Sequence, residues 1–420
     1  GLKEGESFGP EKLRPRIEPW LTALFQSEHF ALLAGSGLPH AIFRLATGNS
    51  LPGMAKGEFT NYADEINAEA QRSAEAVGRK NGNIEDQIRT ANELLRGLEI
   101  GANMNRQSMV TGLREDITRI LQEFAESISK GENGVAISEP KKRENAFNYL
   151  VSFLMSFASR AGTRDRLQIF TTNYDRFIEA GAEVAGLHLL DRFIGSLSPV
   201  FRSSRMDIDM HYNPPGIRGE PRYLEGVARF TKLHGSLDWI NAANSIRRIG
   251  IPFGTENIEP YLNVPGLTGI GYSQLMIYPN AAKDRETAGY PYVELFRDFA
   301  AAICRPNSTL VSYGYSFGDE HINRVIEDML TIPSTHLVVI SYDDPLGRIM
   351  QTYKIMGKPA QVSLLIGSHL GDLQVLVDNY LPKPAIDRTT FRMTELLKAR
   401  FGPGQAEDSE KPSAEGDKQT

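Results

Sequence analysis

The sequence predicts an α/β fold in which a parallel β-sheet carries a large helical insertion. Four stretches, at residues 29–39, 169–179, 230–239 and 310–319, repeat one pattern: an apolar run, then small or polar residues, then a helix or a turn. Buried parallel strands that lead into helices have this pattern. Between the first two stretches, residues 51–145 have few strand signals and are rich in Glu, Ala, Gln, Arg and Leu. We therefore expect a Rossmann-like parallel sheet with a helical insertion domain.

Composition restricts the class of protein. A chain of 420 residues suits one large α/β domain with an insertion, and a hydrophobic fraction of 41% is enough to build its core. The net charge of −6 gives no basic footprint of the kind that direct nucleic-acid binding needs. The single cysteine excludes an internal disulfide and fits a reducing compartment. With no signal peptide and no apolar run of the roughly 18 residues that a membrane helix requires, we expect a cytoplasmic protein that does not bind a membrane.

The chain is expected to divide into five parts: residues 1–50 (an N-terminal helix and the first βα unit), 51–145 (the helical insertion), 146–386 (the remainder of the Rossmann-like domain), 387–401 (a C-terminal helix) and 402–420 (a disordered tail). Apolar residues in the insertion recur at intervals of three and four, as in amphipathic helices. These stripes are expected to form an internal core, and the alternative is a surface for a partner. Residues 130–143 contain two glycines and a proline, and we expect them to form a surface loop.

The first strand, which ends near Ala34, is followed by Gly35, Ser36 and Gly37. Glycines at this place let the backbone approach a pyrophosphate closely, with amide groups or a helix N-terminus pointing at it. The third glycine of the dinucleotide-binding fingerprint is missing, which disfavours a conventional Rossmann oxidoreductase.

The second strand leads through Thr172, Asn173 and Asp175 into a helix. The carboxyl ends of parallel strands are where open α/β sheets bind ligands, so Asn173 and Asp175 are expected to face a pocket. In the alternative interpretation, Asp175 only caps the helix and Asn173 only makes a turn.

Two later strands end in further candidates. The third stretch ends in His234 and Gly235, and the fourth leads through Gly314 and Ser316 to Asp319. An imidazole titrates near neutral pH and suits base catalysis, but a histidine at a strand end can also be a purely structural residue. Asp319 stands before a helix, and the alternative to a functional role is that it only caps this helix.

Taken in order, these motifs resemble the sirtuin-like NAD-binding family over roughly residues 25–50 and 150–380. The corresponding elements are a Gly-Ala-Gly phosphate loop (Gly35-Ser36-Gly37), a Gln-Asn-Ile-Asp loop (Thr172-Asn173-Tyr174-Asp175), a catalytic His-Gly pair (His234-Gly235) and a Gly-x-Ser nucleotide loop (Gly314-Tyr315-Ser316). The chain is most similar to the bacterial anti-phage branch, in which such domains hydrolyse NAD.

The chain departs from the family pattern in two places. Protein-deacylating sirtuins hold zinc with two Cys-x-x-Cys pairs, whereas this chain has only Cys304, so a four-cysteine zinc site is impossible and no metal is expected. Residues 240–280, which take the place of the zinc module, are expected to form a lid. In the phosphate loop, Pro39 occupies the position of the family's serine, and Arg44 is not preceded by the family's aspartate.

The resemblance implies that NAD+ is the substrate and that it is cleaved to nicotinamide and ADP-ribose. Asn173 would position the attacking water and His234 would act as the base, while Asp175 would either contact the nicotinamide end or orient the loop. The implied cofactor contacts are Ala34, Gly35, Ser36, Gly37, Thr172, Gly235, Gly314, Ser316 and Asp343, with the backbone amides of residues 35–37 on the phosphates and Asp343 near the adenosine. A zinc-less protein deacylase and a non-catalytic NAD or ADP-ribose sensor are the alternatives.

An enzyme that hydrolysed NAD+ freely would be toxic to its own cell, so such an effector needs a receiver for an activating signal. The helical insertion and residues 387–401 are the candidate receivers. The resemblance also points to stand-alone proteins that partner HerA-type hexameric ATPases. We therefore expect a homo-oligomer that docks on such an ATPase.

Overall fold

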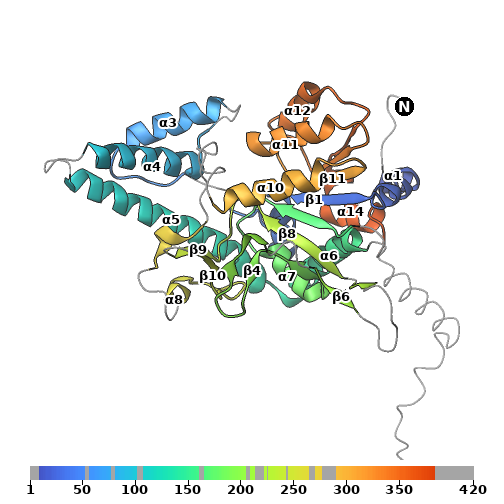
Figure 1. Cartoon of the computed structure of the whole chain (residues 1–420), viewed down its shortest axis with the longest axis horizontal. Helices are drawn as coiled ribbons and strands as arrows, with labels where there is room; N and C mark the ends of the chain where they lie inside the picture. The colour runs from blue at the N-terminus through green and yellow to red at the C-terminus, as the bar shows by residue number, and fades with distance from the viewer. Residues whose placement is uncertain are drawn as a thin grey trace, which may run out of the picture.

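The computed structural model describes residues 9–52, 56–76, 81–101, 107–159, 165–204, 209–212, 222–224, 226–242, 245–263, 270–276 and 290–383. The expected C-terminal helix at 387–401 and the expected tail at 402–420 lie outside these residues. Figure 1 shows a central sheet covered by helices on both faces. No helix in the described part of the chain is long and apolar enough to cross a membrane.

The central sheet has seven strands, all parallel, which confirms the expected α/β, Rossmann-like fold. In spatial order they are β13 (Val362–Ile366), β12 (His336–Ser341), β11 (Ser308–Tyr313), β1 (His29–Ala34), β2 (Gln168–Thr171), β8 (Val227–Lys232) and β3 (His188–Leu190). From β1 the chain adds β2 and β8 on one side, then returns to add β11, β12 and β13 on the other. The strand order therefore reverses between β1 and β11, which is where doubly wound sheets bind ligands.

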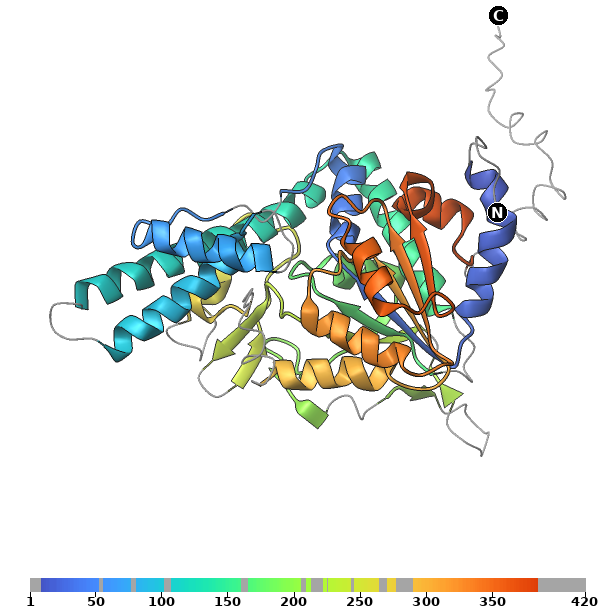
Figure 2. The same ribbon diagram turned by 90° about the horizontal axis from the view of Figure 1, so that it is seen from above.

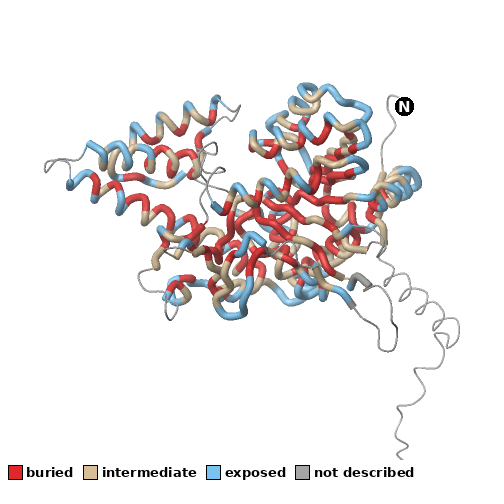
Figure 3. Tube along the Cα trace, in the orientation of Figure 1, coloured by how far each residue is buried: buried red, intermediate tan, exposed pale blue. Residues whose placement is uncertain are grey.

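Strand β1 shows how the two faces of the sheet are covered. Phe30, Leu32 and Ala34 lie in one buried apolar cluster, and Ala31 and Leu33 lie in the other, as expected from the two-residue period of a strand. The helices on the first face are α1 (Pro10–Leu24), α2 (Gly37–Thr47), α6 (Pro140–Ala158), α7 (Phe177–Ala185) and α14 (Leu373–Asn379). Those on the second face are α10 (Tyr292–Ile303), α11 (Glu320–Leu330) and α12 (Arg348–Met356). Figure 3 shows that buried residues concentrate along the strands between these layers.

Three helices between α2 and α6 project to one side of the sheet (Figure 2): α3 (Ala63–Ala76), α4 (Ile84–Ile100) and α5 (Gln107–Ala136). Their apolar stripes are buried, among them Ile88, Leu113, Ile117 and Ile120. The stripes therefore form an internal core of this part of the chain.

The expectation of a surface loop at 130–143 is wrong. Helix α5 continues to Ala136, and α6 begins at Pro140, so the expected boundary at residue 145 falls inside a helix. The two glycines lie within α5 because larger side chains would collide with α2 and the segment after it. A Cβ on Gly134 would lie 2.7 Å from Phe43 Cε2, and one on Gly131 would lie 2.9 Å from Leu51 Cδ1. The glycines allow close packing rather than a turn.

The described part of 240–280 is not a lid. It forms β9 (Trp239–Ala242), β10 (Ser245–Arg248), α8 (Glu259–Leu262) and the short 3-10 helix η3 (Tyr272–Gln274), and β9 and β10 join β4 (Phe193–Ile194) and β5 (Val200–Phe201) in an antiparallel sheet. Ile249, Ile258 and Leu275 pack in one cluster with side chains of α5, which explains why the segment is fixed. The remaining elements are the two-stranded sheet of β6 (His211–Tyr212) and β7 (Arg222–Tyr223), and helix α13 (Ser368–Gly371).

Candidate functional site

Two glycine loops meet where the strand order reverses. A Cβ on Gly35 would lie 2.5 Å from the carbonyl oxygen of Gly314 and 2.5 Å from Tyr315 Cα. A Cβ on Gly37 would lie 2.6 Å from Gly314 Cα, and Gly314 itself has φ = 61°. The loops after β1 and β11 thus pack backbone against backbone, which only glycine permits at these positions.

This packing changes the expected phosphate contacts. The amide of Gly35 donates to the carbonyl of Tyr313 at 2.9 Å, and the amide of Gly37 donates to the carbonyl of Gly314 at 3.0 Å. Both amides are therefore engaged within the protein, so the expectation that they bind phosphate is corrected. Ser36 precedes the first residue of α2, and its side chain is exposed at the helix N-terminus. The N-terminus of α2 is the remaining feature of this loop that suits an anion.

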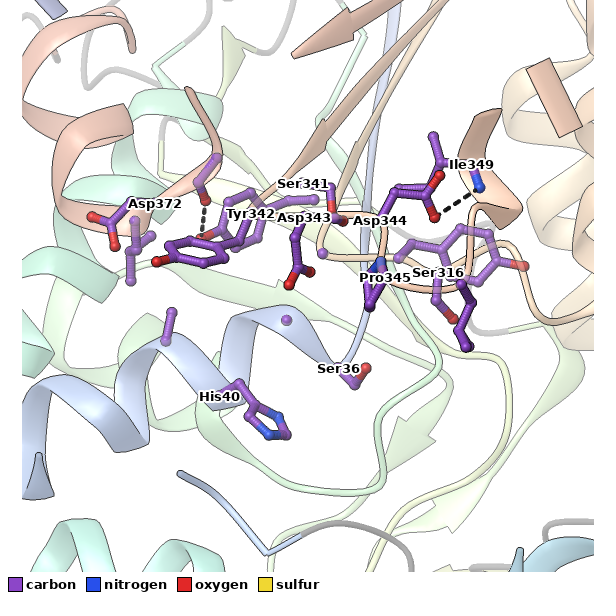
Figure 4. A pocket seen from close by; sticks show the side chains of 18 of the residues that line it. Ser36, His40, Ser316, Ser341, Tyr342, Asp343, Asp344, Pro345, Ile349 and Asp372 are labelled. Atoms are coloured by element: carbon purple, nitrogen blue, oxygen red, sulfur yellow. Dashed lines mark hydrogen bonds between the residues drawn. The ribbon is translucent and has the colours of Figure 1, made fainter. Parts of the chain in front are cut away.

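A cleft of about 420 Å³ opens at this edge of the sheet. Five of the predicted residues line it: Ser36, Gly37, Gly314, Ser316 and Asp343. In Figure 4 the carboxylate of Asp343 points across the cleft toward the start of α2, and the ring of Tyr342 lies to one side of it. Asp343 lies two positions after the end of β12, so the third strand end on this side also contributes to the cleft.

Two cationic residues that were not among the expected site residues also line the cleft, Arg44 and Arg348. Arg348 begins α12, and its guanidinium lies so close to Gly318 that a Cβ there would overlap it. It therefore approaches the loop after β11 from the next βα unit. The signal that could have revealed it is a basic residue at the start of the helix that follows Asp343.

Asn173 lies beside the cleft and is tied to the first loop. Its Nδ2 donates to the carbonyl of Gly35 at 2.9 Å, and its backbone amide donates to Thr171 Oγ1 at 3.1 Å. Thr171 Oγ1 in turn donates to the carbonyl of Ala34 at 2.8 Å. Asn173 is buried, and these contacts direct its amide group while the side-chain oxygen keeps its capacity to accept a hydrogen bond.

His234 forms a hydrogen-bonded pair with Asp319. Its Nε2 lies 2.8 Å from Asp319 Oδ2, and its side chain is 16% exposed to solvent. A carboxylate only accepts hydrogen bonds, so Nε2 carries the hydrogen and Nδ1 of the neutral ring is left to take a proton. Asp319 Oδ1 accepts from the amides of His321 and Ile322 and caps α11. Asp319 is therefore both a helix cap and a histidine partner.

The contacts of Asp175 match the second of the two roles expected for it, which is to orient the loop. Its Oδ1 accepts a hydrogen bond from the amide of Phe177 at 3.3 Å, at the start of α7. Burial raises the pKa of the Asp175 carboxyl to about 7, while the Lys232 ammonium acts to lower it and Glu132 to raise it.

The helices α4 and α5 reach this loop from the other side. Tyr174 donates its hydroxyl to Glu85 Oε1 at 3.3 Å, and Arg176 pairs with Glu132 at 2.5 Å. Glu132 is fully buried and also accepts from the backbone amide of Arg176 at 2.8 Å. The segment from Tyr174 to Arg176 is thus anchored to α4 and α5.

Seven of the predicted residues do not line the cleft: Ala34, Gly35, Thr172, Asn173, Asp175, His234 and Gly235. Ala34 is buried at the end of β1, Thr172 is half-buried, and Gly235 has φ = 93° with the carbonyl of Met276 where a Cβ would be. The loop after β11 connects the two groups, because Ser316 faces the cleft and Asp319, three positions later, binds His234.

Residues 167–356 match the family model of the SIR2-like domain. This match supports membership of the sirtuin-like family. It also supports an NAD-related activity, since sirtuin-like domains typically act on NAD+. The sirtuin-like span contains Asn173, His234, Asp319 and Asp343 but begins after the Gly35 loop. No curated protein matches the chain. Within the described ranges, no three or more His, Cys, Asp or Glu side chains form a group that could hold a metal ion.

Proposed function

We propose that the protein is an NAD+ glycohydrolase that cleaves NAD+ to nicotinamide and ADP-ribose. The observation that carries this proposal is the hydrogen bond between His234 and Asp319, on the loop that also lines the cleft with Ser316. It supplies an oriented imidazole at the carboxyl edge of β8, next to the strand whose end holds Asn173.

The reaction needs few groups. The bond between the anomeric carbon and nicotinamide breaks with its electron pair going to the ring nitrogen, so nicotinamide leaves neutral and no general acid is required. A water oxygen forms the new bond to the anomeric carbon, and its proton passes to His234 Nδ1 and then to solvent. Asn173 Oδ1 accepts a hydrogen bond from this water and orients it.

The cleft suits the remainder of NAD+. We place the pyrophosphate at the N-terminus of α2 beside Ser36, with Arg348, which also lines the cleft, supplying positive charge. The adenosine then lies against Tyr342 and Asp343, whose carboxylate can accept hydrogen bonds from ribose hydroxyls. The loop from Gly314 to Asp319 guides the nicotinamide ribose toward His234.

Two alternatives make different demands, namely a zinc-less NAD-dependent protein deacylase and a non-catalytic NAD or ADP-ribose sensor. Incubation of the purified protein with NAD+, with and without an acylated peptide, separates the three. Nicotinamide release without peptide supports the glycohydrolase, release only with peptide supports the deacylase, and tight binding without release supports the sensor.

We further propose that the activity is that of a cytoplasmic anti-phage effector that depletes NAD+, held inactive until a signal arrives. Its receiver is the set of helices α3, α4 and α5, which projects from the sheet (Figure 2) and contacts the site through Glu85 and Glu132. The assembly proposed is a homo-oligomer that docks on a HerA-type hexameric ATPase. Mass photometry tests the first part, because a monomer with full NAD+-cleaving activity would refute it.

A further inference from the structure

Lys232 is a buried lysine directed at the loop that carries Asn173. It is the last residue of β8 and is 1% exposed. Its Nζ donates to Glu179 Oε1 at 3.0 Å, to the carbonyl of Tyr174 at 3.4 Å and to the carbonyl of Asp175. An ammonium group has three hydrogens, and here it has three acceptors.

This arrangement joins the two parts of the proposed active site. Lys232 stands two positions before His234, and its two carbonyl acceptors stand one and two positions after Asn173. The carbonyl of Tyr174 also accepts from the amide of Leu237 at 3.0 Å. Ser236 Oγ donates to the same carbonyl at 3.4 Å. One backbone amide and two side chains from the segment around His234 therefore bind the same short stretch of the other loop.

A buried ammonium group is costly, and a strand end in an apolar layer does not need one. The charge is retained at lower cost because Glu179, on α7, supplies a counter-charge. An apolar side chain would fill the same space but could not fix the direction of two carbonyl groups. The geometry thus indicates a role in holding the backbone of the loop rather than in packing.

We propose that Lys232 is a positioning residue, which fixes the backbone of Tyr174 and Asp175 and so sets the place of the Asn173 side chain relative to His234. Glu179 is its counter-charge. The expected effect of Lys232 on kcat rests on the proposed NAD+ hydrolysis. Its expected effect on the order of the loop backbone does not.

The test is the variant Lys232→Met, which keeps an unbranched side chain that is one atom shorter and removes the donors. We expect kcat for NAD+ to fall by about 100-fold with KM changed by less than about 3-fold, because displacement of a water-positioning group affects the transition state more than binding. Hydrogen–deuterium exchange of residues 172–180 should become faster. The matched control is Arg229→Met on the same strand, whose cation faces Asp209 instead and which should leave both readouts unchanged.

The two proposals fail in different ways. If the wild-type protein releases no nicotinamide, the proposed function is wrong, whereas unchanged exchange at 172–180 in Lys232→Met overturns the role of Lys232 whether or not NAD+ is cleaved. If Lys232→Met does not fold, Glu179→Gln is the second variant. It removes the counter-charge and leaves Nζ with a neutral acceptor, and we expect faster exchange in the same residues and about 10-fold lower kcat. Wild-type exchange and kcat in Glu179→Gln would contradict the inference.

Discussion

The Nε2 atom of His234 and the Oδ2 atom of Asp319 lie 2.8 Å apart and join the loop after β8 to the N-terminus of α11. The other carboxylate oxygen of Asp319 caps that helix. One carboxylate therefore couples the position of the proposed base to a rigid element, and it also selects the tautomer of the imidazole.

This double role gives a prediction for Asp319→Asn. Asparagine caps a helix as well as aspartate does, so the thermal midpoint should change little. The amide no longer provides a charged acceptor for Nε2–H, and we expect NAD+ turnover to fall by roughly 10³- to 10⁴-fold. Asp319→Ala is the comparison, because it should lose the same turnover and, in addition, about 1 kcal/mol of stability. Wild-type turnover in Asp319→Asn would show that Asp319 is only a cap.

Asn173→Ala tests the proposed position of the water. The variant loses the side-chain oxygen and the hydrogen bond to the carbonyl of Gly35, while the cleft residues are untouched. We expect kcat to fall by two to three orders of magnitude, where each tenfold loss corresponds to about 1.4 kcal/mol of transition-state stabilisation. The affinity for NAD+ should stay within a few-fold of the wild type. Calorimetric titration and steady-state kinetics measure the two quantities separately. A loss of binding equal to the loss of turnover would place Asn173 in NAD+ recognition instead.

The buried pair of Glu132 and Arg176 should contribute strongly to stability. In Glu132→Gln the guanidinium of Arg176 remains buried without its counter-charge, and removal of one partner of such a pair typically costs about 3–5 kcal/mol. The free energy of unfolding from urea denaturation measures this cost. The exposed pair of Arg14 and Glu18 offers a control, since Glu18→Gln should cost less than about 1 kcal/mol. Equal costs for the two variants would mean that the buried pair is not what fixes α5 to the loop.

Asp175 should give the protein a pH-dependent stability of a known sign. Burial raises the pKa of this carboxyl from 3.8 to about 7 in the folded state. The folded state then binds the proton more tightly than the unfolded state, so the contribution to stability is complete below about pH 4 and is lost as the pH rises through 7. We expect the unfolding free energy of the wild type minus that of Asp175→Asn to fall as the pH rises from about 4 through 7. A difference that is flat or rises with pH would contradict the burial of the ionisable group.

The sheet could be predicted from the sequence because its strands are short apolar runs that end in glycine or polar residues. Residues 29–39 show the reason: every buried position of β1 is apolar, and Gly35 marks the place where the backbone meets Gly314. Glycine predicted the wrong structure at Gly131 and Gly134. In the sequence, a helical glycine that makes room for a neighbouring side chain cannot be distinguished from a glycine that makes a turn.

The partners of the candidate site could not be predicted in this way. Glu132 lies 44 positions before Arg176, and no local pattern links them. Lys232 looks like the polar end of an apolar strand, although its amine is buried among carbonyls. For Asp319 the sequence offered a cap or a functional group as alternatives, and the fold uses the residue for both contacts.

The most direct test of NAD+ hydrolysis is to incubate the full-length protein with NAD+ in ¹⁸O-labelled water and analyse the products by chromatography and mass spectrometry. We expect equal amounts of nicotinamide and ADP-ribose, with one ¹⁸O at the anomeric carbon of the ADP-ribose and no need for an acylated peptide. His234→Ala and Asn173→Ala should form neither product at a comparable rate. Release of nicotinamide only when an acylated peptide is present, or binding of NAD+ with no release at all, would contradict the proposed glycohydrolase activity.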